Sequence, residues 1–173
     1  TAGATVYDAK VILLTQKDVA CEEPKGDDLY KMGVVAEIKH VVKNPRGNLN
    51  VVFEGISRIR VKEFSIDSGF ISGTGITRPE SKHTSVPKQI SAIAFEIKRR
   101  LADIKDIHPS FTEELRINTE AITDFGYFAD FVASSAIVDY KNKQTILESL
   151  LIKTRLEKLL IALEEEAMLL ECE

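Results

Sequence analysis

The 173-residue chain lacks tryptophan, has only two cysteines and three histidines, and contains no long apolar run. A bilayer-spanning helix needs about 20 consecutive apolar residues, and no stretch approaches that length. The opening residues show no basic segment followed by an apolar one, so we expect no secretory leader. Cys21 and Cys172 lie near opposite ends of the chain, and we favour a reduced cytoplasmic pair over a disulfide.

The charge balance excludes a general affinity for acidic partners. The chain has 23 Lys and Arg against 27 Asp and Glu, a net charge of −4. Such a balance gives no overall attraction for nucleic acid or acidic membranes. With 44% hydrophobic and 29% charged residues, the composition is typical of a soluble globular protein of one or two domains.

Motifs for phosphate binding or serine nucleophiles are incomplete. Gly73-Thr74-Gly75 lacks the third glycine and the lysine of a phosphate loop, so we interpret it as a flexible strand edge. Gly55-Ile56-Ser57 begins a nucleophile elbow, but Ile59 stands where the second glycine belongs. We therefore expect no catalytic residue and no cofactor site in this chain.

Metal ligands are equally scattered. His40, His83 and His108 are far apart in the sequence, and neither cysteine has a neighbouring ligand. We interpret the three histidines as chance and surface polarity, and no pair of carboxylates stands out for acid–base work. No metal site is expected.

The chain divides into a β-rich part, residues 1–80, and a helical part, residues 81–173. The first part holds eight of the nine glycines and three of the five prolines, whereas the second carries the whole excess of negative charge. Apolar residues alternate with polar ones in the first part and recur at helical spacing in the second.

Short strands joined by tight turns are predicted in the first part, typical of a small barrel or sandwich. Residues 34–42 alternate, residues 44–48 supply turn chemistry, and Asn50–Phe53 returns as the second arm of a hairpin. Further strands are expected at residues 58–63 and 70–76, and Val11–Leu14 is typical of a central buried strand.

Helices are predicted throughout the second part. Apolar residues from Ile90 to Ile104 form one stripe on a helix that Pro109 ends. A shorter helix is expected from the Ser110–Glu113 capping spacing, and Thr123 or Asp124 can cap the next one. From Asn142 a final helical pattern runs to the end.

The final helix carries a row of apolar residues at heptad spacing, which we call the heptad seam, and no glycine marks its end. We expect this helix to continue into further sequence. The seam consists of Leu156, Leu160, Leu163, Ala167 and Leu170.

Two features could support binding. Arg58, Arg60 and Lys62 share one strand face and could contact phosphates, although a solvated face that deters aggregation is the favoured interpretation. Phe125, Phe128, Phe131 and Val132 share one helix side. They could form a peptide groove, but helical core is favoured.

The order of several motifs resembles the amino-terminal domain of Lon proteases over nearly the whole chain, from about residue 11 to 173. Asp28–Ile38 resembles the signature strand of that family, after Leu14-Thr15-Gln16-Lys17. Later matches are Pro45-x-Gly47, Val51–Gly55 with Arg58-x-Arg60, Phe128–Ala133, Lys143-Gln144, Leu147-Glu148 and Arg155–Glu157 with Leu160 and Leu163.

The resemblance implies an α+β fold: a PUA-like β-barrel or sheet domain followed by a helical bundle ending in a long helix. In that family the unit precedes an ATPase module, which implies ATP and magnesium, and a Ser–Lys protease domain. It helps to select unfolded or degron-bearing proteins and supports a homohexamer. Glu54 and Gly55 match the family motif, and we expect both to have structural roles. Gly55 would permit a turn, and Glu54 would pair with a nearby arginine.

The start of the chain departs from that pattern. Family members usually open with a Pro-Leu-Arg strand, a further strand and a helix, whereas this chain enters a strand almost at once at Val11. Closure of the β-domain is therefore left open. No transit segment is visible, which favours a bacterial cytoplasm over a mitochondrial matrix.

Two hypotheses follow. The first is a substrate-recognition and assembly domain of an ATP-dependent Lon-type serine protease, which binds but does not cleave. A stand-alone adaptor without an ATPase is a variant of it. The second is a stand-alone PUA-like nucleic-acid-binding module using Arg58, Arg60 and Lys62, and the acidic net charge counts against it.

Overall fold

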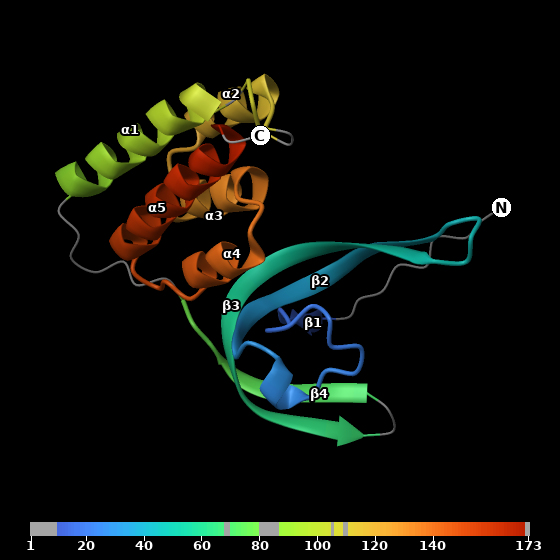
Figure 1. The fold of residues 1–173 in the computed structure, drawn as a ribbon. Helices are drawn as coiled ribbons and strands as arrows, with labels where there is room; N and C mark the ends of the chain where they lie inside the picture. Colours follow the sequence, from blue (N-terminus) through green and yellow to red (C-terminus); the bar gives the residue numbers. More distant parts are fainter. Residues whose placement is uncertain (1–9, 68–69, 80–86, 105, 109–110, 172–173) are drawn as a thin grey trace. The chain divides into compact units, whose positions relative to one another are not determined.

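The computed structural model describes residues 10–67, 70–79, 87–104, 106–108 and 111–171. The chain forms two compact units, Thr1–Pro79 and Glu80–Glu173, which are treated separately below as the β unit and the helical unit. Four antiparallel strands are followed by five helices among these residues, which confirms the predicted α+β class (Figure 1).

The β unit is an antiparallel meander. Its strands are β1 (Lys10–Leu13), β2 (Met32–Lys43), β3 (Leu49–Asp67) and β4 (Phe70–Thr77), in the spatial order β1-β2-β3-β4. A short 3-10 helix, η1 (Gly26–Asp28), lies in the β1–β2 connection. β1 lies at one edge of the described strands, not at the centre as its apolar run predicted, because it pairs with β2 alone. The sheet is not closed by pairing between β1 and β4 in the described part of the chain.

The turn between β2 and β3 forms where its sequence predicts. The Asn44 side chain accepts hydrogen bonds from the backbone N–H groups of Arg46 and Asn48, both at 3.0 Å. Gly47 adopts a φ of 87°, a left-handed conformation that residues with a Cβ adopt only at a cost. Side-chain capping by asparagine and the conformational freedom of glycine together reverse the chain.

β3 is one 19-residue strand, which corrects the expectation of two separate strands at 50–53 and 58–63. Gly55 does not make the expected turn: it pairs with Ala36 inside the β2–β3 ladder, and the next pair is Val35 with Ser57. Ile56 is therefore an extra residue in β3, a β-bulge that bends the strand without ending it.

The distal half of the β2–β3 hairpin is more exposed than the predicted alternation implies. Near β1, Ala36 of β2 is fully buried, whereas Val42 toward the turn is 51% exposed. β1 contacts β2 only at residues 34–37, and β4 contacts β3 only from Ile59 onward. Residues 38–43 and 49–53 thus form a two-stranded ribbon among the described strands.

The helical unit contains α1 (Pro87–Ile104), α2 (Glu113–Ala121), α3 (Phe125–Ala136), α4 (Tyr140–Leu147) and α5 (Ile152–Glu171). The predicted stripe of α1 is confirmed, because Ile90, Ala94, Ile97, Leu101 and Ile104 all belong to the core. α1 and α5 pack against each other, and α3 and α4 also pack against α5.

Helix starts are capped by side chains, with one change from expectation. Thr112, and not Ser110, is the N-cap of α2, and Asp124 caps α3 as predicted. Asp139 caps α4 in the same way. Each cap accepts a hydrogen bond from a backbone N–H in the first helical turn, which stabilises that end of the helix. Pro109 and Ser110 lie outside the described residues.

The final helical pattern is two helices, not one, because residues 148–151 separate α4 from α5. The predicted seam of α5 is only partly the buried face. Leu156 and Leu163 are fully buried, but Leu159 and Ala162 are buried beside them while Leu160 is only half-buried. A helix packed against several neighbours buries a broader stripe than a two-stranded coiled coil does. None of the described helices is both long and apolar enough to cross a membrane.

Candidate functional site

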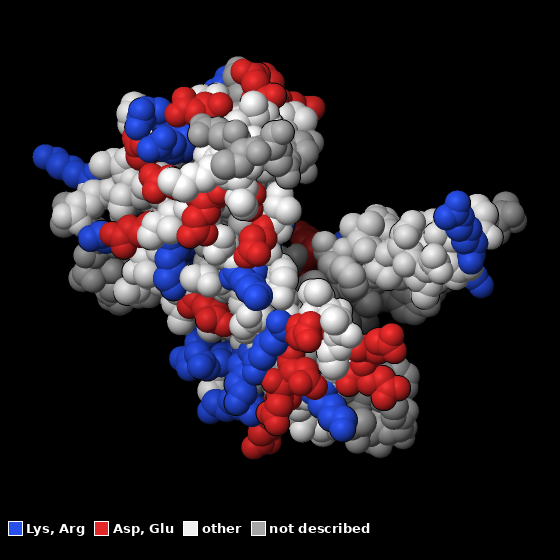
Figure 2. Space-filling view, in the orientation of Figure 1, with Lys and Arg blue, Asp and Glu red and all other residues white. Residues whose placement is uncertain are grey.

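The basic residues of β3 do not form a phosphate-binding row. Arg60 and Lys62 are exposed, but Arg58 is 9% exposed, while Ile59 and Val61 on the opposite face belong to the core. On the face shown in Figure 2, basic and acidic side chains are intermixed. The favoured interpretation, a solvated strand face, fits Arg60 and Lys62 and is wrong for the buried Arg58.

Glu54 pairs with a lysine, which corrects the expected arginine partner. Lys39 forms ion pairs with Glu37 and with Glu54, the latter at 2.7 Å. The hydrogen bonds to Glu37 and Glu54 raise the pKa of the Lys39 ammonium, and the hydrogen bond from Lys39 lowers the pKa of the Glu37 carboxyl. Lys39 and Glu37 therefore stay charged at neutral pH, and the two ion pairs of Lys39 hold β2 against β3.

One face of the β2–β3 ribbon is almost wholly apolar. Residues directly opposite each other across an antiparallel pair have side chains on the same face. Phe53 is opposite Ile38, and Val51 is opposite Val41. Leu49 continues this face toward the turn, where it lies opposite the exposed Lys43, and both Leu49 and Phe53 are exposed. We call Ile38, Val41, Leu49, Val51 and Phe53 the apolar ribbon face.

The β unit also has a small hollow lined by apolar side chains from β1, β3, β4 and the β1–β2 connection. Its volume is about 190 Å³. The lining residues are Ile12, Leu14, Leu29, Val61, Phe64, Ile71 and Gly73. It lacks charged groups among these residues, and its size suits an apolar side chain better than a cofactor.

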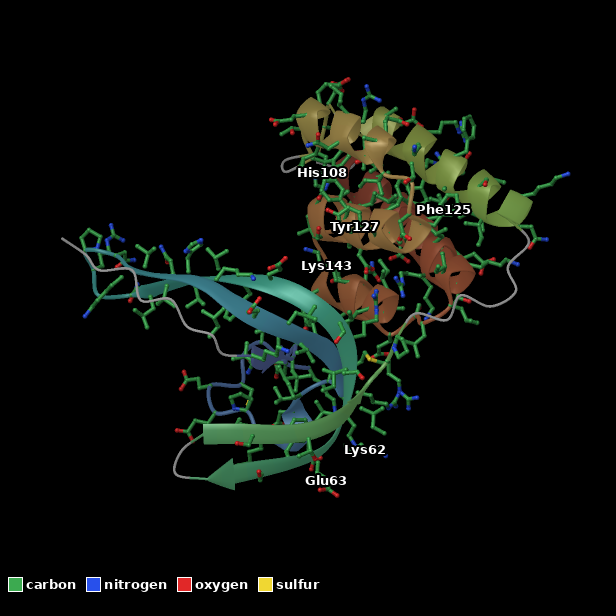
Figure 3. All side chains as sticks on the ribbon, turned by 180° about the vertical axis from the view of Figure 1, so that it is seen from behind. Lys62, Glu63, His108, Phe125, Tyr127 and Lys143 are labelled. Carbon is green, nitrogen blue, oxygen red and sulfur yellow. The ribbon has the colours of Figure 1, made fainter. Side chains whose placement is uncertain are left out.

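The aromatic residues of α3 divide between core and surface. Phe128 and Val132 are fully buried, as the core interpretation predicts, and Phe125 packs partly buried against the same core. Phe131 is half-buried and its ring lies 6.2 Å from the exposed ring of Tyr127. Phe125 and Tyr127, labelled in Figure 3, thus leave aromatic surface at the start of α3.

A second hollow, of about 170 Å³, lies between α1 and the start of α3. We call it the α1–α3 groove. Phe125 and Phe128 both line this space, so part of the phenylalanine group borders a hollow, and its use as a peptide groove stays a prediction. The full lining is Ser91, Ala94, Phe95, Lys98, Ile122, Phe125 and Phe128.

His108 is a structural residue, and its interpretation as surface polarity is wrong. It is 7% exposed, its Nδ1 accepts the backbone N–H of Phe111 at 2.9 Å, and its Nε2 lies 3.0 Å from the carbonyl oxygen of Ala136. Since a backbone N–H can only donate, Nε2 carries the proton and donates to Ala136. The described residues hold no group of three or more His, Cys, Asp or Glu that could bind a metal ion. His83 lies outside the described residues.

Several residues of the matched motifs make buried polar contacts within the helical unit. Arg155 is fully buried, donates from Nε to the Ser149 carbonyl at 2.9 Å, and pairs with Asp130 at 3.5 Å. Gln144 of α4 is also buried and donates to Glu148 at 3.0 Å. These contacts explain the motif residues as parts of the fold.

Glu166 is a polar residue that sequence reasoning missed. It is buried, and its Oε1 accepts the backbone N–H groups of Val138 and Asp139 at 2.7 and 3.1 Å. The signal in the sequence is weak, because Glu166 stands among three other glutamates of α5 that are at least partly exposed.

The comparisons with known proteins agree with this fold. The model of the ATP-dependent protease La (LON) substrate-binding domain matches residues 4–165. The Lon protease of Halothermothrix orenii is 33% identical over 98% of this chain, and that of Brevibacillus choshinensis is 31% identical over 98%. The chain spans about 22% of the length of each.

Two solved structures share the fold. The N-terminal domain of the Mycobacterium avium complex Lon protease superposes with a TM-score of 0.66 at 19% identity, covering 93% of this chain and 94% of that one. The Lon N-terminal domain protein from Xanthomonas campestris gives 0.54 at 14% identity, covering 90% of each chain. The nucleic-acid-binding hypothesis finds no support in these matches. The chain belongs to the family of Lon substrate-binding domains.

Proposed function

We propose that this chain is the substrate-recognition and assembly part of an ATP-dependent Lon-type serine protease that degrades misfolded and short-lived regulatory proteins. In this proposal the chain binds unfolded or degron-bearing proteins and does not cleave them. The Lon proteases that match it are several times longer, which supports placing the ATPase and the Ser–Lys protease chemistry, with ATP and magnesium, in other parts of a parent protein.

The apolar ribbon face is the observation that carries the proposal. Leu49 and Phe53 are 63% and 41% exposed there. Exposed apolar surface on an otherwise charged domain marks a protein-binding site. A native protein buries its apolar side chains, so an unfolded chain is the partner that this surface distinguishes.

Contacts of this kind are individually weak, because each removes only a small apolar area from water. Several domains in a homohexamer would raise the effective concentration of an unfolded chain that one domain has already bound. This is the assembly role we propose. The relatives named above are bacterial, which supports a bacterial cytoplasmic setting.

The test is binding of the purified chain to denatured casein, to a native globular protein and to single-stranded RNA, each at low and high salt. We expect binding to casein that survives high salt, since apolar contacts do not depend on released counterions. Neither the native protein nor the RNA should bind comparably.

Salt-sensitive RNA binding without casein binding would overturn the proposal. Binding to no unfolded protein, even when the domain is tethered at high density on a surface to supply avidity, would also overturn it.

A further inference from the structure

The α1–α3 groove has the dimensions of a site for one side chain. α1 supplies Ser91, Ala94, Phe95 and Lys98, which are spaced three and four residues apart and therefore lie along one side of the helix. With a volume of about 170 Å³, the groove is smaller than the roughly 300–1,000 Å³ of sites for whole small molecules. Its natural occupant is a single large side chain.

The lining of the groove favours an aromatic occupant. Phe125 and Phe128 approach it from α3, and Phe95 forms an exposed wall on α1, with 70% of its surface accessible. Aromatic rings attract one another in edge-to-face and offset arrangements beyond the effect of buried area. A ring inserted here would also cover part of Phe95.

Lys98 gives the groove a charge preference. It is the one charged residue in the lining of the groove, and its Nζ lies 5.7 Å from the centroid of the Phe128 ring, a cation–π distance. Nζ also forms an ion pair with Glu120, at 3.0 Å from Oε2, and lies 3.5 Å from the backbone oxygen of Glu120. An ammonium has three N–H donors, so Lys98 can pair with an incoming carboxylate beside Glu120, as Lys39 pairs with two glutamates.

We propose that the α1–α3 groove binds one aromatic side chain of an unfolded polypeptide whose neighbouring residue is acidic, with the acidic group on Lys98. The inference rests on the proposed function and adds to it a site on the helical unit and a sequence preference. A basic neighbour would lie against Lys98 and be disfavoured by like-charge repulsion.

The probes are three fluorescently labelled Gly/Ser peptides that differ only at two central residues: Phe-Asp, Phe-Lys and Ala-Asp. We expect the intact chain to bind Phe-Asp, with affinity about tenfold lower for Ala-Asp and severalfold lower for Phe-Lys. Equal binding of all three peptides would overturn the proposal.

Two variants locate the site. Ser91→Trp fills the groove from an exposed position, and we expect it to lower Phe-Asp affinity about tenfold. Ile161→Trp, at an exposed apolar position of α5 outside the groove, is the matched control and should bind as the unmodified chain does. Circular dichroism checks that both variants are folded. Loss of Phe-Asp binding in both variants, or in neither, would contradict the assignment of the binding site to the α1–α3 groove.

Reversal of charge gives a second and independent test. Lys98→Glu should change the preference from Phe-Asp to Phe-Lys, whereas Lys141→Glu, on an exposed part of α4, should keep the original order. A folded Lys98→Glu variant with an unchanged preference would overturn the role of Lys98.

Denatured casein separates the two proposals. If the intact chain binds casein while the Ser91→Trp variant binds the peptides normally, the groove proposal fails and the proposed function stands. If the intact chain binds neither casein nor peptide, both fail.

Discussion

His108 joins two segments of the helical unit that are distant in sequence. It accepts from Phe111 and donates to Ala136 at the end of α3. We predict that His108→Ala lowers the free energy of unfolding by about 2–3 kcal/mol, because it removes two hydrogen bonds and leaves a buried N–H without its acceptor. Urea denaturation followed by circular dichroism measures this.

The control for this substitution is His40→Ala, at an exposed position of β2. It should change stability by less than about 0.5 kcal/mol. Equal effects at the two positions would show that the hydrogen bonds of His108 do not stabilise the fold.

At the scale of the element, Gly33 fixes how closely β1 approaches β2. A Cβ at this position would lie 2.2 Å from the carbonyl oxygen of Leu13, a backbone atom that cannot move aside without displacing β1. We predict that Gly33→Ala destabilises the β unit by roughly 1–3 kcal/mol. Gly55→Ala is the control, since its Cβ would meet only the Val34 side chain at 3.3 Å. Amide hydrogen exchange should rise in β1 in the first variant and not in the second.

The β2–β3 ribbon gives the element-scale test of the proposed function. Phe53→Lys places a charge on the apolar ribbon face, and we predict a roughly fivefold loss of casein affinity. Asn50→Lys adds the same charge three residues away, on the opposite face of the ribbon, because Asn50 is opposite Val42. It should bind casein normally. Equal losses would indicate a charge effect and contradict a role for this face.

Elements with a regular pattern could be predicted from the sequence. Whether two neighbouring segments form one continuous element could not. The stripe of α1 and the Asn44–Gly47 turn follow from local spacing. The Glu54-Gly55 sequence suggests a turn, but pairing of Gly55 with Ala36 continues the strand through it. The burial of Arg155 and Glu166 depends on backbone partners in the connections between helices, at Ser149 and Val138, which periodicity cannot reveal.

At the scale of the whole molecule, the candidate site was only partly predictable. The sequence singled out Phe125 and Phe128 but offered no way to pair them with Phe95 and Lys98 of α1, which a tertiary contact brings together. Similarly, Val41 and Val51 share the apolar ribbon face because of a register set by the hairpin turn, and an irregularity after Ile38 brings Ile38 onto the same face. One-residue changes in register exchange the two faces of a strand.

Both units should lose stability together in acid. Hydrogen bonding to Lys39 lowers the pKa of Glu37 in the β unit, and hydrogen bonding to Arg99 lowers that of Glu96 in the helical unit. A carboxyl with a lowered folded-state pKa stabilises the chain above its unfolded value, near 4.5, and loses this effect as pH falls through the lowered folded value. Protonation also leaves the 23 Lys and Arg without their counter-charges, which adds repulsion.

We therefore predict that the urea midpoint changes little between pH 7 and 5.5 and falls steeply between about pH 4.5 and 3. The combined Glu37→Gln and Glu96→Gln variant should start lower at pH 7 and fall less steeply, because it lacks the two carboxyls whose ion pairs are lost in acid. Glu114→Gln, at an exposed position, is the control for removal of a charge. Identical pH profiles in the combined variant and the unmodified chain would mean that neither Glu37 nor Glu96 contributes to acid sensitivity.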